Sequence, residues 1–193
     1  MKKGLWKIIF AILLLPVWAN AIDFYDDGWI TDGNVFDTVN IWNDANVIMT
    51  GGWAFYCNLY DSSAFNFYDG DVGLFSTYHS AIVNVFADDY SGFDINNQSQ
   101  VHLFNGAHIA DVQIFDEMAQ LHIYGYDLEY IISAPDSVEG FWPDDRSFSI
   151  HIRNSSMGAL RDNVFLHEIP EPSALSLLGL LVLFMRKRGE KAK

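Results

Sequence analysis

Several residue types are scarce in this chain of 193 residues, and each shortage excludes a class of protein. A single cysteine, Cys57, excludes an intramolecular disulfide and any zinc site built on several thiolates. Charged residues make up 19% of the sequence and hydrophobic residues 50%, so intrinsic disorder does not describe the whole chain. The length suits one domain of ordinary size together with targeting segments.

Lysine and arginine are missing from most of the chain. Residues 8–145 contain neither, and between the two basic ends only Arg146, Arg153 and Arg161 remain. Residues 22–173 therefore carry three cations against 24 acidic residues, a net charge of −21. Nucleic acid is excluded as a partner because phosphates are bound by lysine and arginine. Such acidity either keeps an aromatic-rich protein soluble or attracts divalent cations, and the sequence leaves both explanations open.

The N-terminal residues 1–21 have the three-part form of a secretory signal peptide. A basic start precedes an apolar run over residues 8–18, and Ala19 and Ala21 supply the small residues that signal peptidase accepts. The apolar run is well short of the ~20 residues that span a bilayer, which disfavours an N-terminal membrane anchor. We expect cleavage before Ile22 and export of the remainder.

The C-terminal residues 170–193 combine three features in a fixed order. Pro170-Glu171-Pro172 is restricted to an extended conformation, because proline fixes φ and lacks a backbone donor. The following residues 174–185 are apolar and rich in leucine, and as a helix they would reach ~18 Å against a hydrocarbon core of ~30 Å. The basic cluster Arg186-Lys187-Arg188 then marks the cytoplasmic side of a membrane.

This order of motif, hydrophobic stretch and basic tail resembles the PEP-CTERM sorting signal, found in exported proteins of Gram-negative bacteria that make extracellular polysaccharide. Residues 166–169 also resemble the strand that often precedes such a signal. The resemblance implies recognition by a membrane-embedded exosortase, which would cut near Pro170-Glu171-Pro172. It further implies a transient anchorage in the inner membrane, delivery of the body to the cell surface or the extracellular space, and extracellular polysaccharide as a candidate partner.

Triplets recur between residues 39 and 123, most of them with apolar flanks and a polar centre; the two imperfect members, 47–49 and 74–76, have an apolar centre but keep the spacing. In one series the first residues are 18, 18, 18 and 20 positions apart, and in a second, interleaved series they are 18, 17, 19 and 19 apart. The first series is 47–49, 65–67, 83–85, 101–103 and 121–123, and the second is 39–41, 57–59, 74–76, 93–95 and 112–114. Alternation of this kind is typical of a strand with one buried face, and turn-forming Gly, Asn, Asp and Ser lie between the triplets.

The regular spacing predicts an all-β fold, a parallel β-helix or β-roll-like solenoid of about five coils of ~18 residues. A β-sandwich would space its strands less regularly. We expect an N-terminal lead-in or cap over residues 22–38, the solenoid over 39–132, a small C-terminal β cap and linker over 133–169, and the sorting signal with its hydrophobic helix over 170–193. Phe141 and Trp142 are candidates to plug the end of the core. Cys57 is expected to face inward, and the triplet centres to face outward: Asn40, Asn58, Asn66, Asn84, His102 and His122.

Parallel β-helices include polysaccharide lyases and glycoside hydrolases, so a carbohydrate-active enzyme is the alternative to a non-catalytic body. Such sites need paired carboxylates on one exposed face, or bound calcium with a cationic base. The adjacent pairs Asp26-Asp27, Asp88-Asp89 and Asp144-Asp145 would point to opposite faces in a strand and would be solvated in a turn. The predicted solenoid also contains no lysine or arginine. We therefore assign no catalytic residue.

Metal and sugar binding rest on scattered residues. Aspartates recur at predicted turns, but no Gly-Gly-x-Gly-x-Asp repeat follows Gly51-Gly52, which favours Asx turns over a calcium site. We therefore assign no cofactor and leave Ca²⁺ as an open option. His102 and His122 are expected to stack on one face, as a solvated pair unless a third ligand joins them. Six aromatics either present rings to sugars or pack in the core: Tyr56, Tyr60, Tyr68, Tyr78, Phe86 and Tyr90. The favoured interpretation is an exported, sorted, structural or adhesive protein without catalytic activity.

Overall fold

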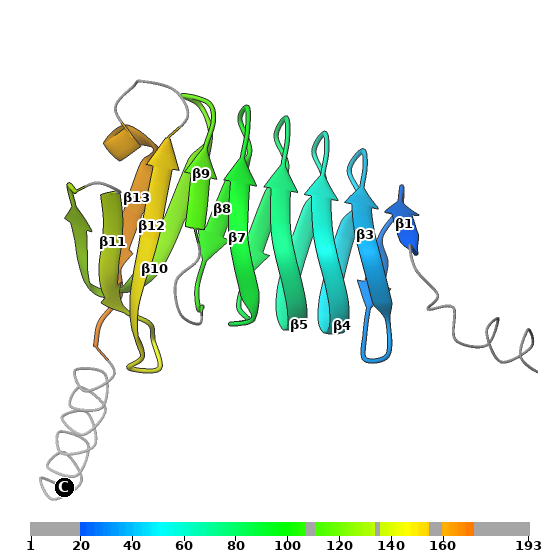
Figure 1. Ribbon diagram of the computed structural model, residues 1–193, viewed down its shortest axis with the longest axis horizontal. Helices are drawn as coiled ribbons and strands as arrows, with labels where there is room; N and C mark the ends of the chain where they lie inside the picture. The colour runs from blue at the N-terminus through cyan, green and yellow to red at the C-terminus, as the bar shows by residue number, and fades with distance from the viewer. Residues whose placement is uncertain (1–19, 107–110, 134–135, 155–159, 172–193) are drawn as a thin grey trace, which may run out of the picture.

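Parallel strands stacked into a solenoid of about six turns make up the body of the protein (Figure 1). The computed structural model describes residues 20–106, 111–133, 136–154 and 160–171. The elements are β1 Ala21–Phe24, β2 Gly28–Ile30, β3 Val35–Ile41, β4 Asn46–Leu59, β5 Ala64–Thr77, β6 Ile82–Val85, β7 Tyr90–Ile95, β8 Gln100–Leu103, β9 Asp111–Ile114, β10 Gln120–Ile131, β11 Asp136–Phe141, β12 Ser147–Asn154, a 3₁₀ turn η1 Leu160–Asn163, and β13 Val164–Glu168. The expected all-β solenoid is confirmed.

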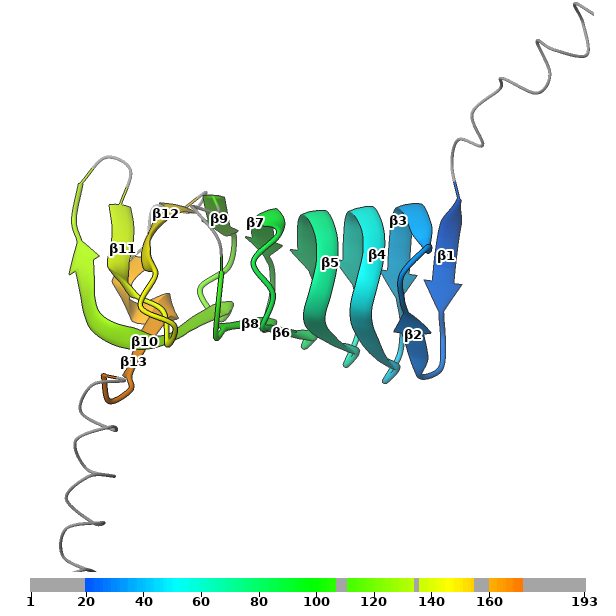
Figure 2. The same cartoon turned by 90° about the horizontal axis from the view of Figure 1, so that it is seen from below.

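Two columns of parallel strands run along the solenoid (Figure 2). The first sheet consists of β2, the first halves of β4 and β5, then β6, β8, β10 and β13. The second sheet consists of β1, β3, the second halves of β4 and β5, then β7, β9 and β12. Because β4 and β5 bend from one column into the other, all strands belong to one hydrogen-bonded network.

The apolar flanks of the triplets form the core between the two sheets. Residues one coil apart are register partners, as with Phe65 and Val83 on the first sheet or Cys57 and Phe75 on the second. These side chains are fully buried, and each removes apolar area from water that would be exposed in an isolated coil. Cys57 lies among them, and burial raises the pKa of its thiol. The inward position expected for Cys57 is confirmed.

One triplet lies in a different register from the one expected. The pairing places Phe75, Ser76 and Thr77 opposite residues 57–59, so Leu74 faces outward and the expected triplet 74–76 is wrong by one residue. A polar residue, Thr77, occupies the inward position, and its hydroxyl lies 2.7 Å from that of Ser99, which is also buried. This hydrogen bond makes burial of a threonine acceptable where the pattern led us to expect an apolar side chain.

The polar centres of the triplets face outward and hydrogen-bond from coil to coil, as expected. On the first sheet Asn84 donates to Asn66, and Asn66 donates to Asn46, at 3.0 and 2.8 Å. On the second sheet Asn58 donates to Asn40 at 2.9 Å. Stacked amides satisfy one another in this way because each carries both a donor and an acceptor.

The turns between the second and first sheets form another ladder, which we name the turn ladder: Asn43, Asp61, His79 and Asn97. All four adopt left-handed φ values of 56–61°, a conformation in which Asn and Asp are enriched. The backbone N–H of each donates to a side chain of the next coil, over 2.6–3.3 Å, ending at Asp116. The spacing of 18 residues therefore has a backbone cause as well as a packing cause.

The C-terminal region joins the solenoid and also departs from it. β12 pairs in parallel with β9, and β13 pairs in parallel with β10, so both continue the two sheets. Between them the second half of β10 pairs antiparallel with β11, and β11 with β12. Trp142 is fully buried against Phe148, at a ring distance of 4.0 Å, as expected of a plug, whereas Phe141 is outside and stacks on Tyr126.

Among the four described ranges, no helix is long and apolar enough to cross a membrane. The expected signal peptide through residue 19 and the expected hydrophobic helix over residues 174–185 lie outside the described residues.

Candidate functional site

A groove on the outer face of the second sheet is the most chemically varied surface feature of the described residues. It has a volume of about 420 Å³ and is lined by Phe55, Tyr56, Gly73, Leu74, Ser91, Gly92, Asp94, Asp111 and Gln113. These residues come from β4, β5, β7 and β9, so four consecutive coils build it. The groove thus depends on the stacking of coils and not on any one of them.

Two aromatic rings form one wall of the groove. Phe55 and Tyr56 follow the buried Ala54 and precede the buried Cys57, and they are 43% and 41% exposed. Their rings meet edge to face at a centroid distance of 4.6 Å. Two consecutive exposed aromatics interrupt the alternation of β4 at its bend between the sheets. Of the six aromatics considered from the sequence, Tyr56 is the one that enters this groove.

Glycines keep the floor of the groove low. A Cβ on Gly92 would lie 2.7 Å from the carbonyl oxygen of Asp111, and one on Gly73 would lie 2.5 Å from that of Phe55. Neighbouring strands approach each other too closely at these positions for a larger residue. The outward column between Tyr56 and Asp111 is therefore occupied only by Leu74 and Gly92.

Polar side chains from β7 and β9 form the opposite wall. Asp94 is directly opposite Gln113 in the register, and Gly92 is opposite Asp111. Burial raises the pKa of Asp94 above its ordinary value, because a half-buried carboxylate is poorly solvated. Within the described residues, the side chains of Asp94 and Gln113 have no hydrogen-bond partner.

A cation from outside the predicted repeats also reaches this wall. Arg153 on β12 donates to Asp111 over 2.9 Å, and His151 Nδ1 lies 3.7 Å from the same carboxylate. Arg153 is 42 residues from Asp111 in the sequence and arrives because β12 continues the second sheet. Residues 39–132 themselves contain no lysine or arginine, as the sequence shows, and this cation comes from the segment that was expected to form the C-terminal cap.

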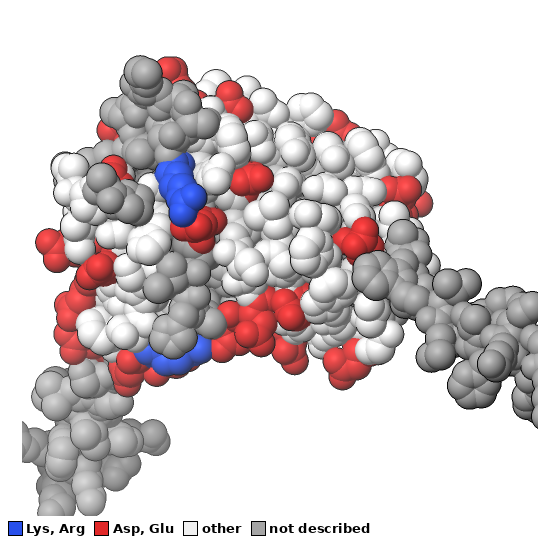
Figure 3. All heavy atoms as spheres, in the orientation of Figure 1, with Lys and Arg blue, Asp and Glu red and all other residues white. Residues whose placement is uncertain are grey.

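Electrostatically, the described surface is dominated by carboxylates. Figure 3 shows acidic side chains in patches scattered over one face, among mainly uncharged residues, with the few basic side chains beside acidic ones. Arg146 is the clearest case, since it contacts Asp88 and Asp144 at 2.6 and 2.7 Å and Asn105 at 2.9 Å. Two of the carboxylate pairs considered for catalysis thus contribute to one structural ion-pair cluster, which fixes the turn after Trp142 against the solenoid.

The first sheet presents an aromatic ladder, defined as Tyr68, Phe86, Phe104, Tyr124 and His167. Successive rings are 4.3–4.8 Å apart and within 14° of parallel. The expected stacking of His102 on His122 is confirmed beside it, at 4.5 Å and 5°. These rings cover one another and leave no groove between them.

A third histidine, His167, joins the pair, and the sequence did not indicate it because it is 45 residues from His122. Nδ1 of His122 lies 3.0 Å from Nε2 of His167, and its Nε2 lies 3.1 Å from Gln120. Burial, with the neighbouring His102 and His167, lowers the pKa of His122 to about 4. Both ring nitrogens of His122 are thus within hydrogen-bonding distance of a partner, and its ring is neutral near pH 7.

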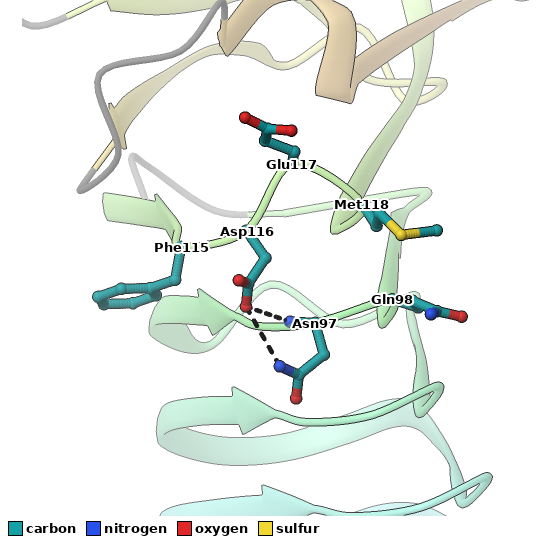
Figure 4. Close-up of a pocket in the computed structure, with 6 residues that line it drawn as sticks. All are labelled: Asn97, Gln98, Phe115, Asp116, Glu117 and Met118. Carbon is teal, nitrogen blue, oxygen red and sulfur yellow. Dashed lines mark hydrogen bonds between the residues drawn. The ribbon is translucent and has the colours of Figure 1, made fainter.

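A second hollow, of about 480 Å³, lies at the turn ladder (Figure 4). Its lining consists of Asn97, Gln98, Phe115, Asp116, Glu117 and Met118. The carboxylate of Asp116 accepts from the backbone N–H and the side-chain amide of Asn97, whereas Glu117 points away from it (Figure 4). Asp116 therefore acts as a turn cap here.

Four of the six aspartates considered for calcium, which are Asp61, Asp69, Asp71, Asp88, Asp89 and Asp111, make contacts within the fold. Asp61 accepts from the backbone of Asn43, Asp69 accepts from Gly70, and Asp88 and Asp111 are ion-paired with arginines. Within the described ranges, no group of three or more His, Cys, Asp or Glu side chains could hold a metal ion. These contacts favour the Asx-turn explanation of the recurring aspartates.

The residues assigned to processing lie at the two ends of the described body. Ala21 begins β1, and Pro170 and Glu171 are exposed just after β13. The last backbone hydrogen bond before the motif runs from Ile169 to Gly125, at 2.8 Å. Ala19, Pro172 and the basic cluster Arg186-Lys187-Arg188 lie outside the described residues.

No family model, no curated protein and no solved structure matches this chain.

Proposed function

We propose that this chain is an exported protein sorted by an exosortase-type membrane enzyme through residues 170–193. Signal peptidase would act first, after Ala21, and the C-terminal segment would anchor the chain in the inner membrane until the motif is cut. The exposure of Pro170 and Glu171 immediately after the last strand supports cleavage at the motif, because an exposed peptide can enter a protease cleft. The final location is the cell surface or the extracellular space.

The body is then a structural or adhesive component without catalytic activity. The observation that carries this part is the repetition of its outer surface: the same kinds of side chain recur on successive coils, as amide ladders and aromatic ladders. Adjacent coils lie ~4.8 Å apart in a hydrogen-bonded sheet, so equivalent groups recur along a straight line. Such a surface suits contact with a polymer, and extracellular polysaccharide is the expected partner.

Mass spectrometry of the mature protein from its host tests the sorting proposal. We expect an N-terminus at Ile22 and loss of the residues that follow the motif near Pro170-Glu171-Pro172. Glu171→Ala should leave the uncleaved form in the membrane fraction, whereas Glu139→Ala, on an exposed strand position of β11, should be processed normally. Recovery of the surface form with residues 177–193 still attached would contradict the proposal.

A carbohydrate-active enzyme is the second candidate, and one observation favours it. The groove of the second sheet combines two carboxylates, Asp94 and Asp111, with an adjacent guanidinium from Arg153. Against it, the charges of Asp111 and Arg153 engage each other, so that of the two carboxylates in the groove only Asp94 has no partner among the described residues. Release of new reducing ends from a polysaccharide, abolished by Asp94→Asn, would establish the enzyme and displace the non-catalytic proposal.

A further inference from the structure

We infer that the groove of the second sheet is a binding site for a neutral sugar unit of a glycan chain. The inference rests on the adhesive role proposed above and gives it a location and a ligand class. It is independent of the sorting proposal, because the groove lies wholly within residues 55–113.

The polar wall of the groove suits a ligand that donates hydrogen bonds. Asp94 and Gln113 lie side by side on neighbouring strands, and within the described residues neither side chain is hydrogen-bonded. Farther along the same column, Asn40 and Asn58 are paired in an amide ladder. Half-buried polar groups without partners are costly unless water or a ligand satisfies them. Sugar hydroxyls donate to a carboxylate and accept from an amide, so one ligand satisfies both.

The aromatic wall requires a ligand with an apolar face. Tyr56 and Phe55 are each more than two-fifths exposed, although the residues on either side of the pair, Ala54 and Cys57, are buried. A pyranose ring has one face made of C–H groups and an edge made of hydroxyls. It can therefore stack on an aromatic ring of one wall while its hydroxyls reach the opposite wall. The groove volume of about 420 Å³ is within the range of small-ligand sites.

The charge around the groove selects a neutral sugar over an acidic one. The carboxylate of Asp94 lies in the groove, and residues 22–173 carry a net charge of −21, so a uronic acid or a sulfated sugar is repelled. The nearest cation, Arg153, is held by Asp111 and is not free to bind an anion.

Affinity electrophoresis of the mature exported chain tests the site, with gels containing hydroxyethylcellulose, dextran, alginate or chitosan. We expect retardation in at least one of the neutral polymers and none in alginate. Tyr56→Ala and Asp94→Asn should each weaken that binding about threefold to tenfold, the size expected for one stacking contact or one charge-assisted hydrogen bond. Trp29→Ala removes an exposed aromatic side chain of β2, outside the groove and outside the aromatic ladder, and serves as the control, with unchanged binding.

Each other outcome overturns the inference in a distinguishable way. Equal binding of the wild-type protein and both groove variants places the sugar elsewhere and leaves an adhesive body in place. Absence of retardation in both neutral polymers removes the neutral-sugar assignment, and preference for chitosan assigns the groove to a cationic glycan. Circular dichroism of the variants shows whether a loss of binding reflects a loss of fold. None of these outcomes bears on processing at the C-terminal motif, which mass spectrometry measures separately.

Discussion

Replacing Phe75 or Leu74 with alanine tests the register of the solenoid directly. Phe75 is fully buried, and its ring lies 4.9 Å from Phe93, 5.6 Å from Phe65 and 5.8 Å from Phe67. Full burial of such a side chain contributes about 1.5–3 kcal/mol, and a stacked aromatic pair adds about 0.5–1.5 kcal/mol. With the cavity that remains, Phe75→Ala should lower the free energy of unfolding by about 3–5 kcal/mol.

Leu74 faces outward and is half-buried, so Leu74→Ala should cost only about 1 kcal/mol. Urea unfolding of the exported chain, followed by circular dichroism, gives both values from the shift in midpoint. Phe75→Leu keeps most of the volume and provides a milder variant if Phe75→Ala does not accumulate. A larger loss for Leu74→Ala than for Phe75→Ala would refute the observed register and restore the triplet 74–76.

The remaining predictions concern the histidines and the ion-pair cluster. Because the pKa of His122 is lowered to about 4 from an ordinary 6.5, the unfolded chain takes up a proton at higher pH than the folded chain does. The contribution of His122 to stability is therefore full above pH 6.5 and is lost as the pH falls towards 4. Over this window the urea midpoint of the wild type should fall more than that of His122→Gln. Equal falls of the two midpoints would contradict a lowered pKa of His122. Arg146→Ala should cost about 1 kcal/mol, and a double-mutant cycle with Asp88→Asn should give a coupling of about 0.2–1 kcal/mol, since both side chains are exposed. Zero coupling would contradict a stabilising contribution from this pair.

The repeat could be predicted from the sequence because each coil contributes a short alternating triplet with the same burial. Register partners such as Val83 and Val101 are 18 residues apart and occupy equivalent positions, so the period of the sequence is the period of the structure. The error at Leu74 arose where a threonine took an inward position, and its compensation by Ser99 comes from a different coil. A pattern of apolar residues alone cannot report such a hydrogen bond.

The groove could not be predicted, since its walls come from strands that the sequence separates. Phe55 and Asp111 are more than 50 positions apart, and Arg153 arrives only because β12 returns to the second sheet after an antiparallel excursion. One local signal was present: Phe55 and Tyr56 together break the alternation between Ala54 and Cys57. Consecutive large aromatics outside the inward register indicate a surface position, and that observation would have drawn attention to this part of β4.

The pairing of like with like along the solenoid makes each coil exchangeable with its neighbours. If residues 64–81 were deleted, residues 82–99 would stack directly on residues 46–63. Val83 would then pair with Val47, and Asn84 would take the place of Asn66 beside Asn46. Gene duplications and deletions of 54 nucleotides would thus lengthen or shorten the body without a new fold having to evolve. In Figure 1, β1 and β13 lie at opposite ends of the stack, so a chain tethered at residue 170 would place its first coil farthest from the tether, at a height set by the number of coils.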